Sequence, residues 1–189
     1  MIYLKFYKPY DVLCQFSDPI GRNTLKDYIS IPDIYSVGRL DYRSEGLLLL
    51  TNDGKLSHYL TDPQYQHKKT YLAQVEGIAT NNDIQALQTT LVLPQLQTQL
   101  ARAKIIPDPM LPPRSKPVRD YHPTTWLEIE IGEGKKHQVR RMTAAIGFPT
   151  LRLVRVAIGT LQLEQLEPGE WRYLKKDEIA SLKKPPETR

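Results

Sequence analysis

A continuous apolar run, Leu47 to Leu50, is the feature that most constrains the fold of this chain. With Gly46 and Thr51 it has the length of one β-strand, and the absence of a polar position predicts burial on both faces. Asn52-Asp53-Gly54 then predicts a turn into a helix over about 54–60. The run is far shorter than the roughly 18–20 apolar residues of a membrane-spanning helix, so we expect no membrane partner.

Length and composition indicate one globular unit. The 189 residues are 40% hydrophobic and 25% charged, which is ordinary for a single domain of roughly 100–200 residues. We expect a domain over 1–182, a disordered tail over 183–189 and a monomer. The alternating start, Met1 to Lys8, is typical of a strand and not of a signal peptide. A single cysteine, Cys14, excludes an internal disulfide and favours the cytoplasm.

Hydrophobic patterning predicts further strands and helices in an irregular order. Such an order favours an α+β fold with a largely antiparallel or mixed sheet. Residues 91–100 are ambiguous, and the six prolines between 107 and 123 exclude a helix or a central strand, leaving an ordered excursion or a mobile loop. We expect strands at 2–7, 12–16, 69–75, 126–131, 152–158 and 170–174, and helices at 24–29, 81–88 and from 135 to 146.

Positive charge is concentrated near the C-terminal third. The net charge is +5, and residues 135–155 contain six Lys and Arg residues and no Asp or Glu. Such a concentrated field favours a polyanion, with nucleic acid the first candidate, although a solvated helix face is the ordinary alternative. In the expected helix Val139, Met142 and Ile146 form one buried stripe, which leaves Arg140 and Arg141 off that stripe.

A carboxylate stands directly before the apolar strand. Asp41 follows Gly38-Arg39-Leu40, and a loop that precedes a buried strand can hold a catalytic group on a rigid scaffold. On spacing alone a local structural role is more common, because Asp in such turns usually bonds to nearby backbone.

Three motifs in order resemble those of the bacterial ribosomal pseudouridine synthases, within the branch that acts on large-subunit ribosomal RNA. The first is Gly38-Arg39-Leu40-Asp41 with the following Gly46 to Gly54. The second is Lys69-Thr70-Tyr71. The third runs from Glu133 through Met142 to Gly147-Phe148-Pro149 and Leu151 to Arg155.

The resemblance implies a fold, a reaction and a partner. It implies the catalytic fold of that family, a mainly antiparallel sheet with flanking helices and a central cleft, without the S4-like RNA-binding domain of many relatives. The implied reaction isomerises uridine to pseudouridine, exchanging the N1 link to ribose C1′ for a C5 link. No metal or cofactor is expected, and the sequence has no phosphate-binding glycine loop or Cys/His cluster. The implied partner is ribosomal RNA, free or in an assembling particle.

The same resemblance assigns roles to individual residues. Asp41 becomes the catalytic carboxylate, and Arg140 its bidentate partner, where a surface arginine on phosphate is the alternative. Tyr71 becomes the ring stacked on uracil, and Leu153 the apolar wall, although both are also ordinary core residues. His137 and Gln138 are expected to orient the motif loop. Contacts to RNA are expected from Arg39, Arg43, Lys135, Lys136, Gln138, Arg141, Arg152 and Arg155.

Two other functions stay open at this point. One is an RNA-binding assembly factor that keeps the fold without needing turnover, which loss of Asp41 or Arg140 would have favoured. The other is a hydrolase in which Asp41 and Glu45 act as a paired acid and base. The second requires the two later motifs to be coincidental.

Overall fold

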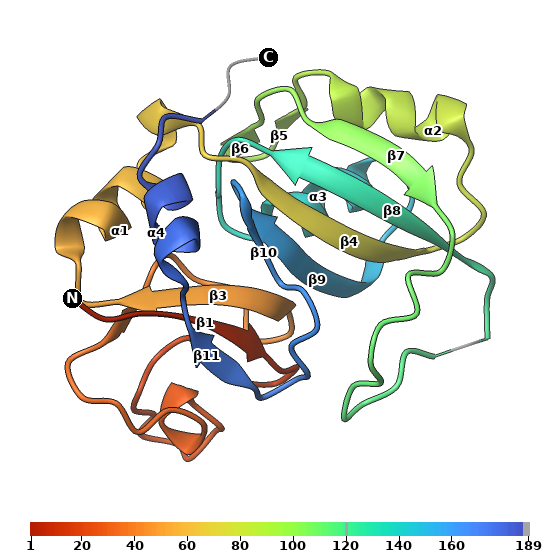
Figure 1. The fold of residues 1–189 in the computed structure, drawn as a ribbon. Helices are drawn as coiled ribbons and strands as arrows, with labels where there is room; N and C mark the ends of the chain where they lie inside the picture. Colours follow the sequence, from red (N-terminus) through yellow and green to blue (C-terminus); the bar gives the residue numbers. More distant parts are fainter. Residues whose placement is uncertain (120, 187–189) are drawn as a thin grey trace.

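A computed structural model describes residues 1–119 and 121–186, and its framework is one mixed sheet (Figure 1). The strand order is β11-β1-β3-β9-β4-β8-β7, with two short strands paired at the side. On this path, within the described residues, β3 and β9 form the parallel pair and the other neighbours are antiparallel. This confirms the expected α+β class.

Eleven strands and four α-helices make up the described part of the chain. The strands are β1 (Tyr3–Lys8), β2 (Tyr35–Ser36), β3 (Glu45–Thr51), β4 (Lys69–Glu76), β5 (Val92–Leu93), β6 (Leu96–Gln97), β7 (Arg102–Ile106), β8 (Thr124–Ile131), β9 (Thr150–Ile158), β10 (Leu161–Gln162) and β11 (Trp171–Tyr173). The helices are α1 (Gly54–Thr61), α2 (Asn81–Gln85), α3 (Gln138–Ala145) and α4 (Lys176–Leu182), with 3-10 helices at Leu25–Asp27, Pro63–Tyr65 and Ala86–Gln88.

The apolar run forms β3, and every residue of that strand is buried. Leu47 and Leu49 pack in a cluster with side chains of α1, whereas Leu48 and Leu50 pack in another cluster against residues of β1 and of the 3-10 helix at Leu25–Asp27. Both faces of the strand are therefore covered, which is why a polar position anywhere in the run would be costly. The helix α1 is capped by Asp53, whose carboxylate accepts a hydrogen bond from the N–H of Leu56 at 3.1 Å.

Glycine is required where β3 meets β9. Gly46 has φ +103°, and a Cβ built there would lie 2.3 Å from the carbonyl oxygen of Arg155 and 2.7 Å from its nitrogen. No side chain fits that space, so the parallel contact between the two strands depends on Gly46. This contact joins the two halves of the sheet and brings the loop before β3 next to β9.

The half of the sheet formed by β4, β8 and β9 is covered differently on its two faces. Val139 and Met142 of α3 pack on one face, together with residues of α2 and the 3-10 helix after it. On the other face, Met110 and Leu111 of the proline-rich excursion line a cavity of about 360 Å³ with Trp126. The excursion leaves β7 and returns to β8 (Figure 1) without helix or strand in its described residues, as expected from its prolines.

Several expected elements differ from the structure. The strand expected at 12–16 is wrong: apart from a single bridge between Leu13 and Thr24, the segment is a loop, because β3 and β11 already occupy both edges of β1. The helix expected at 24–29 is one 3-10 turn capped by Thr24. The helix expected at 81–88 is α2 capped by Thr80, followed by a 3-10 turn. The sequence interpretation missed β2, β7, β10, α4 and the β5–β6 hairpin.

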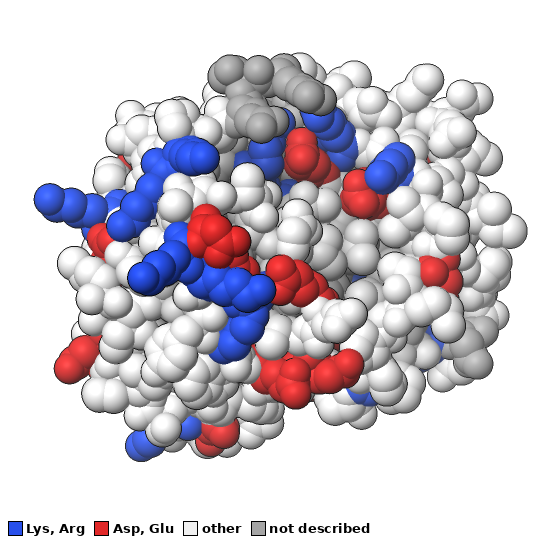
Figure 2. All heavy atoms as spheres, in the orientation of Figure 1, with Lys and Arg blue, Asp and Glu red and all other residues white. Residues whose placement is uncertain are grey.

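The face of the molecule that Figure 2 shows carries both signs of charge. Figure 2 shows Lys and Arg next to Asp and Glu on this face, and Arg172 pairs with Glu178 at 2.7 Å near α4. Of the tail expected at 183–189, residues 183–186 are described, and the carbonyl of Lys184 accepts from Tyr59; residues 187–189 lie outside the described part. Within the described residues, no helix is long and apolar enough to cross a membrane.

Candidate active site

A pocket of about 160 Å³ lies where the loop before β3 meets β4, β9 and the start of α3. It brings together residues from all three sequence motifs. Seven of the expected site residues line it: Arg39, Asp41, Tyr71, Lys135, Gln138, Leu153 and Arg155. Segments separated by more than a hundred residues in the sequence thus form one site. They meet because β9 pairs with β3 on one side and with β4 on the other.

Asp41 is held by contacts on both of its neighbours. A turn closes on it, with the N–H of Ser44 donating to the Asp41 carbonyl at 3.0 Å. On one side the Cys14 thiol donates to the Leu40 carbonyl at 3.3 Å and accepts the Leu40 N–H at 3.2 Å. On the other side the Lys8 ammonium donates to the Tyr42 carbonyl at 3.2 Å. The loop is therefore fixed to β1 and to the loop that follows β1.

Lys8 is fully buried, and burying its charge is costly unless hydrogen-bond acceptors surround the ammonium. Its ammonium also donates to the carbonyls of Pro9 and Val12, at 2.9 and 2.7 Å. Burial lowers the pKa of Lys8 to about 8, and the nearby carboxylates of Glu45, Asp11 and Asp41 oppose this shift. Three carbonyl acceptors satisfy the three donors of the ammonium.

Two nitrogen-bearing side chains approach the Asp41 carboxylate. His137 Nε2 lies 3.5 Å from Oδ1, and Arg140 Nε lies 4.0 Å from Oδ2. His137 has a left-handed backbone (φ 53°) at the start of α3, a conformation that turns the chain into the helix beside Asp41. Burial lowers the pKa of Arg140, and the charge of Asp41 acts in the opposite direction.

The bidentate fork expected between Arg140 and Asp41 is not formed. The terminal guanidinium nitrogens of Arg140 instead donate to the carbonyls of Thr150 and Arg43, at 3.2 and 2.9 Å, and approach Ser44 Oγ at 3.4 Å. The expected bidentate pairing is wrong because both terminal nitrogens of Arg140 already donate to backbone carbonyls. Arg140 still faces Asp41, as a single long contact.

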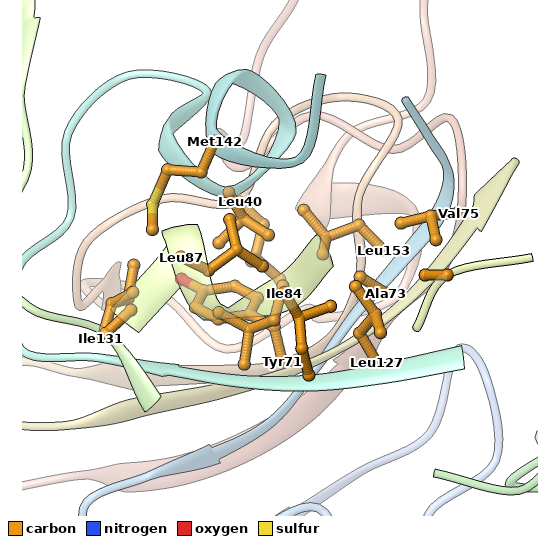
Figure 3. Packing of buried hydrophobic residues seen from close by; sticks show 14 residues of the cluster. Leu40, Tyr71, Ala73, Val75, Ile84, Leu87, Leu127, Ile131, Met142 and Leu153 are labelled. Atoms are coloured by element: carbon orange, nitrogen blue, oxygen red, sulfur yellow. The ribbon is translucent and has the colours of Figure 1, made fainter. Parts of the chain in front are cut away.

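Tyr71 and Leu153 supply apolar walls. Tyr71 is 8% exposed, and Figure 3 shows its ring among Leu40, Ile131 and Leu153 beneath α3. Both residues are therefore core residues and pocket residues at the same time, so the two alternatives weighed from the sequence do not exclude each other. Gln138, which is 3% exposed, donates to Glu133 at 2.7 Å and accepts from the Lys135 N–H at 3.0 Å. These bonds fit the motif-loop role and not the expected contact to RNA.

Sequence reasoning missed Lys69. It stands two residues before Tyr71 on β4, so both side chains point to the same face of the strand, and it lines the pocket. Burial, together with the nearby charge of Arg155, lowers the pKa of Lys69 to about 8. The sequence could have indicated Lys69, because side chains two residues apart on a strand point to the same face and Tyr71 was already a candidate.

Other expected RNA contacts lie outside the pocket or are used internally. Arg43 and Lys136 do not line the pocket, and Arg141 donates to the carbonyl of Pro94. Lys135 pairs with Glu133 at 3.0 Å, which reduces the free positive charge at the pocket edge. Arg155 is buried, so it lies inside the pocket and is not an exposed phosphate contact.

Glu45 and Arg152 form a buried ion pair. Arg152 donates to both carboxylate oxygens of Glu45, at 3.0 and 2.8 Å, and Glu45 is 1% exposed. The expected phosphate contact of Arg152 is therefore wrong, because its fork is already used. Glu45 does not line the pocket with Asp41, which removes the geometric basis for a paired acid and base. Across residues 1–119 and 121–186, no group of three or more His, Cys, Asp or Glu side chains could hold a metal ion.

Comparison with known proteins finds a matching family, similar sequences and a similar fold. Residues 2–145 match the family described as RNA pseudouridylate synthase. Ribosomal large subunit pseudouridine synthase E of Vibrio vulnificus (strain CMCP6) is 52% identical over 171 residues, covering 89% of this chain and 73% of that protein. The Xanthomonas campestris pv. campestris protein of the same name is 50% identical over 170 residues, covering 87% and 91%. A crystal structure of a pseudouridylate synthase superposes with a TM-score of 0.81 at 32% identity, covering 96% of this chain and 73% of that one.

Proposed function

The chain belongs to the family of RNA pseudouridylate synthases, and we propose that it isomerises a specific uridine of large-subunit ribosomal RNA with Asp41 as its catalytic carboxylate. The substrate follows from the names of relatives about half identical over most of the chain. We further propose that one catalytic domain over 1–182 performs the reaction as a monomer in the cytoplasm.

One observation carries the role of Asp41: among the described residues that line the pocket, it is the carboxylate, and the other side chains are apolar, neutral polar or basic. At ribose C1′ an ionised carboxylate acts as a nucleophile or stabilises developing positive charge. His137 and Arg140 face its two oxygens, at 3.5 and 4.0 Å, and Arg140 adds a permanent positive charge beside the carboxylate. The clamps on Leu40 and Tyr42 hold the carboxylate in place before RNA binds.

Tyr71 completes the proposed machinery. Its ring lines the pocket and packs in the same cluster as Leu40 and Leu153, and such a ring offers a surface on which a pyrimidine can stack. A uridine inside an RNA stem cannot expose C1′ and both faces of its base while stacked, so the target enters flipped out. Arg39 lines the pocket beside Asp41, and Lys136 is exposed nearby, so both are proposed to contact the RNA backbone.

The decisive experiment replaces Asp41 in a strain that lacks the gene. Pseudouridine mapping in ribosomal RNA should show one large-subunit site lost in the deletion strain and restored by the wild-type gene. Asp41→Asn keeps the size of the side chain and should restore nothing, while purified protein binds RNA with near wild-type affinity, because phosphate contacts dominate binding.

Asp33→Asn is the matched control. Asp33 is exposed and has a left-handed φ of 53°, a conformation that Asn also tolerates. Asp33→Asn should restore the modification fully. If Asp41→Asn also restored it, the assignment of Asp41 would be refuted; if no site were lost in the deletion strain, a binding function in ribosome assembly would replace the proposed activity.

A further inference from the structure

Two cationic side chains of the pocket, the buried Arg155 and the half-buried Lys69, form no ion pair with a carboxylate among the described residues. Arg155 is 4% exposed; its Nε donates to the Leu47 carbonyl at 2.9 Å, but its Nη2 is buried without a hydrogen-bond partner among the described residues. Lys69 lines the same pocket, and no carboxylate opposes the lowering of its pKa by burial and by Arg155. Buried charges without partners are costly, so their retention points to a ligand.

A local irregularity of the sheet aims Arg155 into the pocket. Between β4 and β9, Thr70 pairs with Ala157 but Tyr71 pairs with Arg155, so one residue of β9, Val156, is skipped. In a regular ladder Val156 would oppose Tyr71, and Arg155 would point to the other face of the sheet. The bulge places Arg155 beside Tyr71, on the face that also carries Lys69, and bulges commonly re-aim side chains at functional sites.

The pocket has the dimensions and lining of a site for one ring. Its volume of about 160 Å³ is well below the roughly 300–1,000 Å³ of pockets that enclose drug-sized ligands. Tyr71 and Leu153 line it with apolar surface, which suits a planar base more than a phosphodiester. The Asp41 carboxylate lies within 4.0 Å of His137 and Arg140, and within the described residues no ion pair joins it to Lys69 or Arg155.

We infer that Lys69 and Arg155 are catalytic residues that donate hydrogen bonds to the carbonyl oxygens of the target uracil and stabilise the negative charge of the detached base. This inference rests on the proposed function. When the bond between C1′ and N1 breaks, its electron pair stays on the base and spreads over N1 and the two carbonyl oxygens. C5 then uses this electron density to bond to C1′, and the proton lost from C5 is balanced by one gained at N1. Fixed cations at the oxygens favour the transition state in which this charge develops.

The test varies the acidity of the leaving base. Single-turnover rates are measured with saturating protein on an RNA fragment of the target site that carries uridine or 5-fluorouridine, following loss of the C1′–N1 linkage by nucleoside mass spectrometry. Fluorine withdraws electrons, so the detached fluorinated base needs less stabilisation by the protein. Lys69→Met should slow the uridine reaction about 100-fold, as loss of one donor to a developing oxyanion does, and the 5-fluorouridine reaction by a clearly smaller factor.

Three further variants separate catalysis from structure. Lys68→Met is the matched control, because Lys68 pairs with Glu130 at 3.4 Å outside the pocket and should keep the wild-type rate. Lys69→Arg keeps the charge and should recover part of the rate. Arg155→Gln should repeat the dependence on the leaving base, and it tests the inference independently if Lys69→Met fails to fold.

Particular outcomes would overturn the inference. Equal slowing on both substrates would show that Lys69 does not act on the charge of the base. A loss of RNA affinity with an unchanged single-turnover rate would make these residues phosphate contacts. Wild-type rates for both Lys69→Met and Arg155→Gln would refute the inference alone, whereas wild-type protein without any conversion of uridine would refute the proposed function.

Discussion

Arg140 faces Asp41 through its Nε at 4.0 Å, while its two terminal nitrogens bond to the backbone carbonyls of Arg43 and Thr150. Arg43 lies in the turn that carries Asp41, and Thr150 is the first residue of β9. The guanidinium thus ties the loop that carries Asp41 to β9, and its contact with the Asp41 carboxylate is the weaker of its interactions. Its contribution to stability should come mainly from these carbonyl bonds.

We therefore expect Arg140→Ala to lower the free energy of unfolding by about 2–3 kcal/mol, since two carbonyls lose a charged donor. Asp41→Asn should change it little. A double-mutant cycle in urea should give a coupling of about 1 kcal/mol or less, because the contact is long and partly exposed. A coupling of several kcal/mol would instead indicate the tight bidentate pair in solution.

Gly46→Ala should prevent stable folding. Its Cβ would lie 2.3 Å from backbone of β9, and neither strand can move without breaking the β3–β9 contact. We expect a loss of about 3–5 kcal/mol, the range of the most damaging single substitutions, measured by urea denaturation. Gly54→Ala is the control: nothing lies within 4 Å of a Cβ there, and alanine suits the first turn of α1. Equal stability of the two variants would contradict the close approach at Gly46.

Glu45→Gln should destabilise the protein by about 3–5 kcal/mol, because it leaves Arg152 buried without its counter-charge. Replacing both residues, Glu45→Gln with Arg152→Met, should recover most of that loss. The double variant should still form pseudouridine, since neither residue lines the pocket. A stable double variant without activity would return Glu45 to the list of catalytic candidates.

The pH dependence of stability should reveal Lys69. Its pKa is about 8 in the folded protein and near the ordinary 10.5 when unfolded. Between these values the unfolded chain binds more protons, so the contribution of Lys69 to the free energy of unfolding rises with pH, by at most about 1.4 kcal/mol per unit. Urea denaturation at pH 7, 8.5 and 9.5 should show wild type gaining stability relative to Lys69→Met. The unsubstituted protein should lose activity over the same range, as the ammonium loses its proton. Parallel stability profiles for the two proteins would place Lys69 in solvent.

Local sequence by itself determined the long central strands and the position of the loop that carries Asp41. The run from Leu47 to Leu50 is stable as a strand that is covered on both faces, and it forms the fully buried β3. The stripe of Val139 and Met142 predicted α3, and the prolines predicted the irregular excursion. The motif resemblance predicted the family, and with it residues that the structure brings into one pocket. These are properties of short segments, which chain sterics and hydrophobic period encode directly.

Only the tertiary structure decided which partner each side chain has. Arg140, Arg152 and Arg155 are alike in the sequence, yet one ties a loop, one neutralises Glu45 and one lies in the pocket. Strand pairing made these choices: a skipped residue at Val156 turned Arg155 to the face of Tyr71, and Gly46 let β3 approach β9. The free energy of a charged side chain depends on acceptors and solvent supplied by distant segments, and no local pattern carries that information.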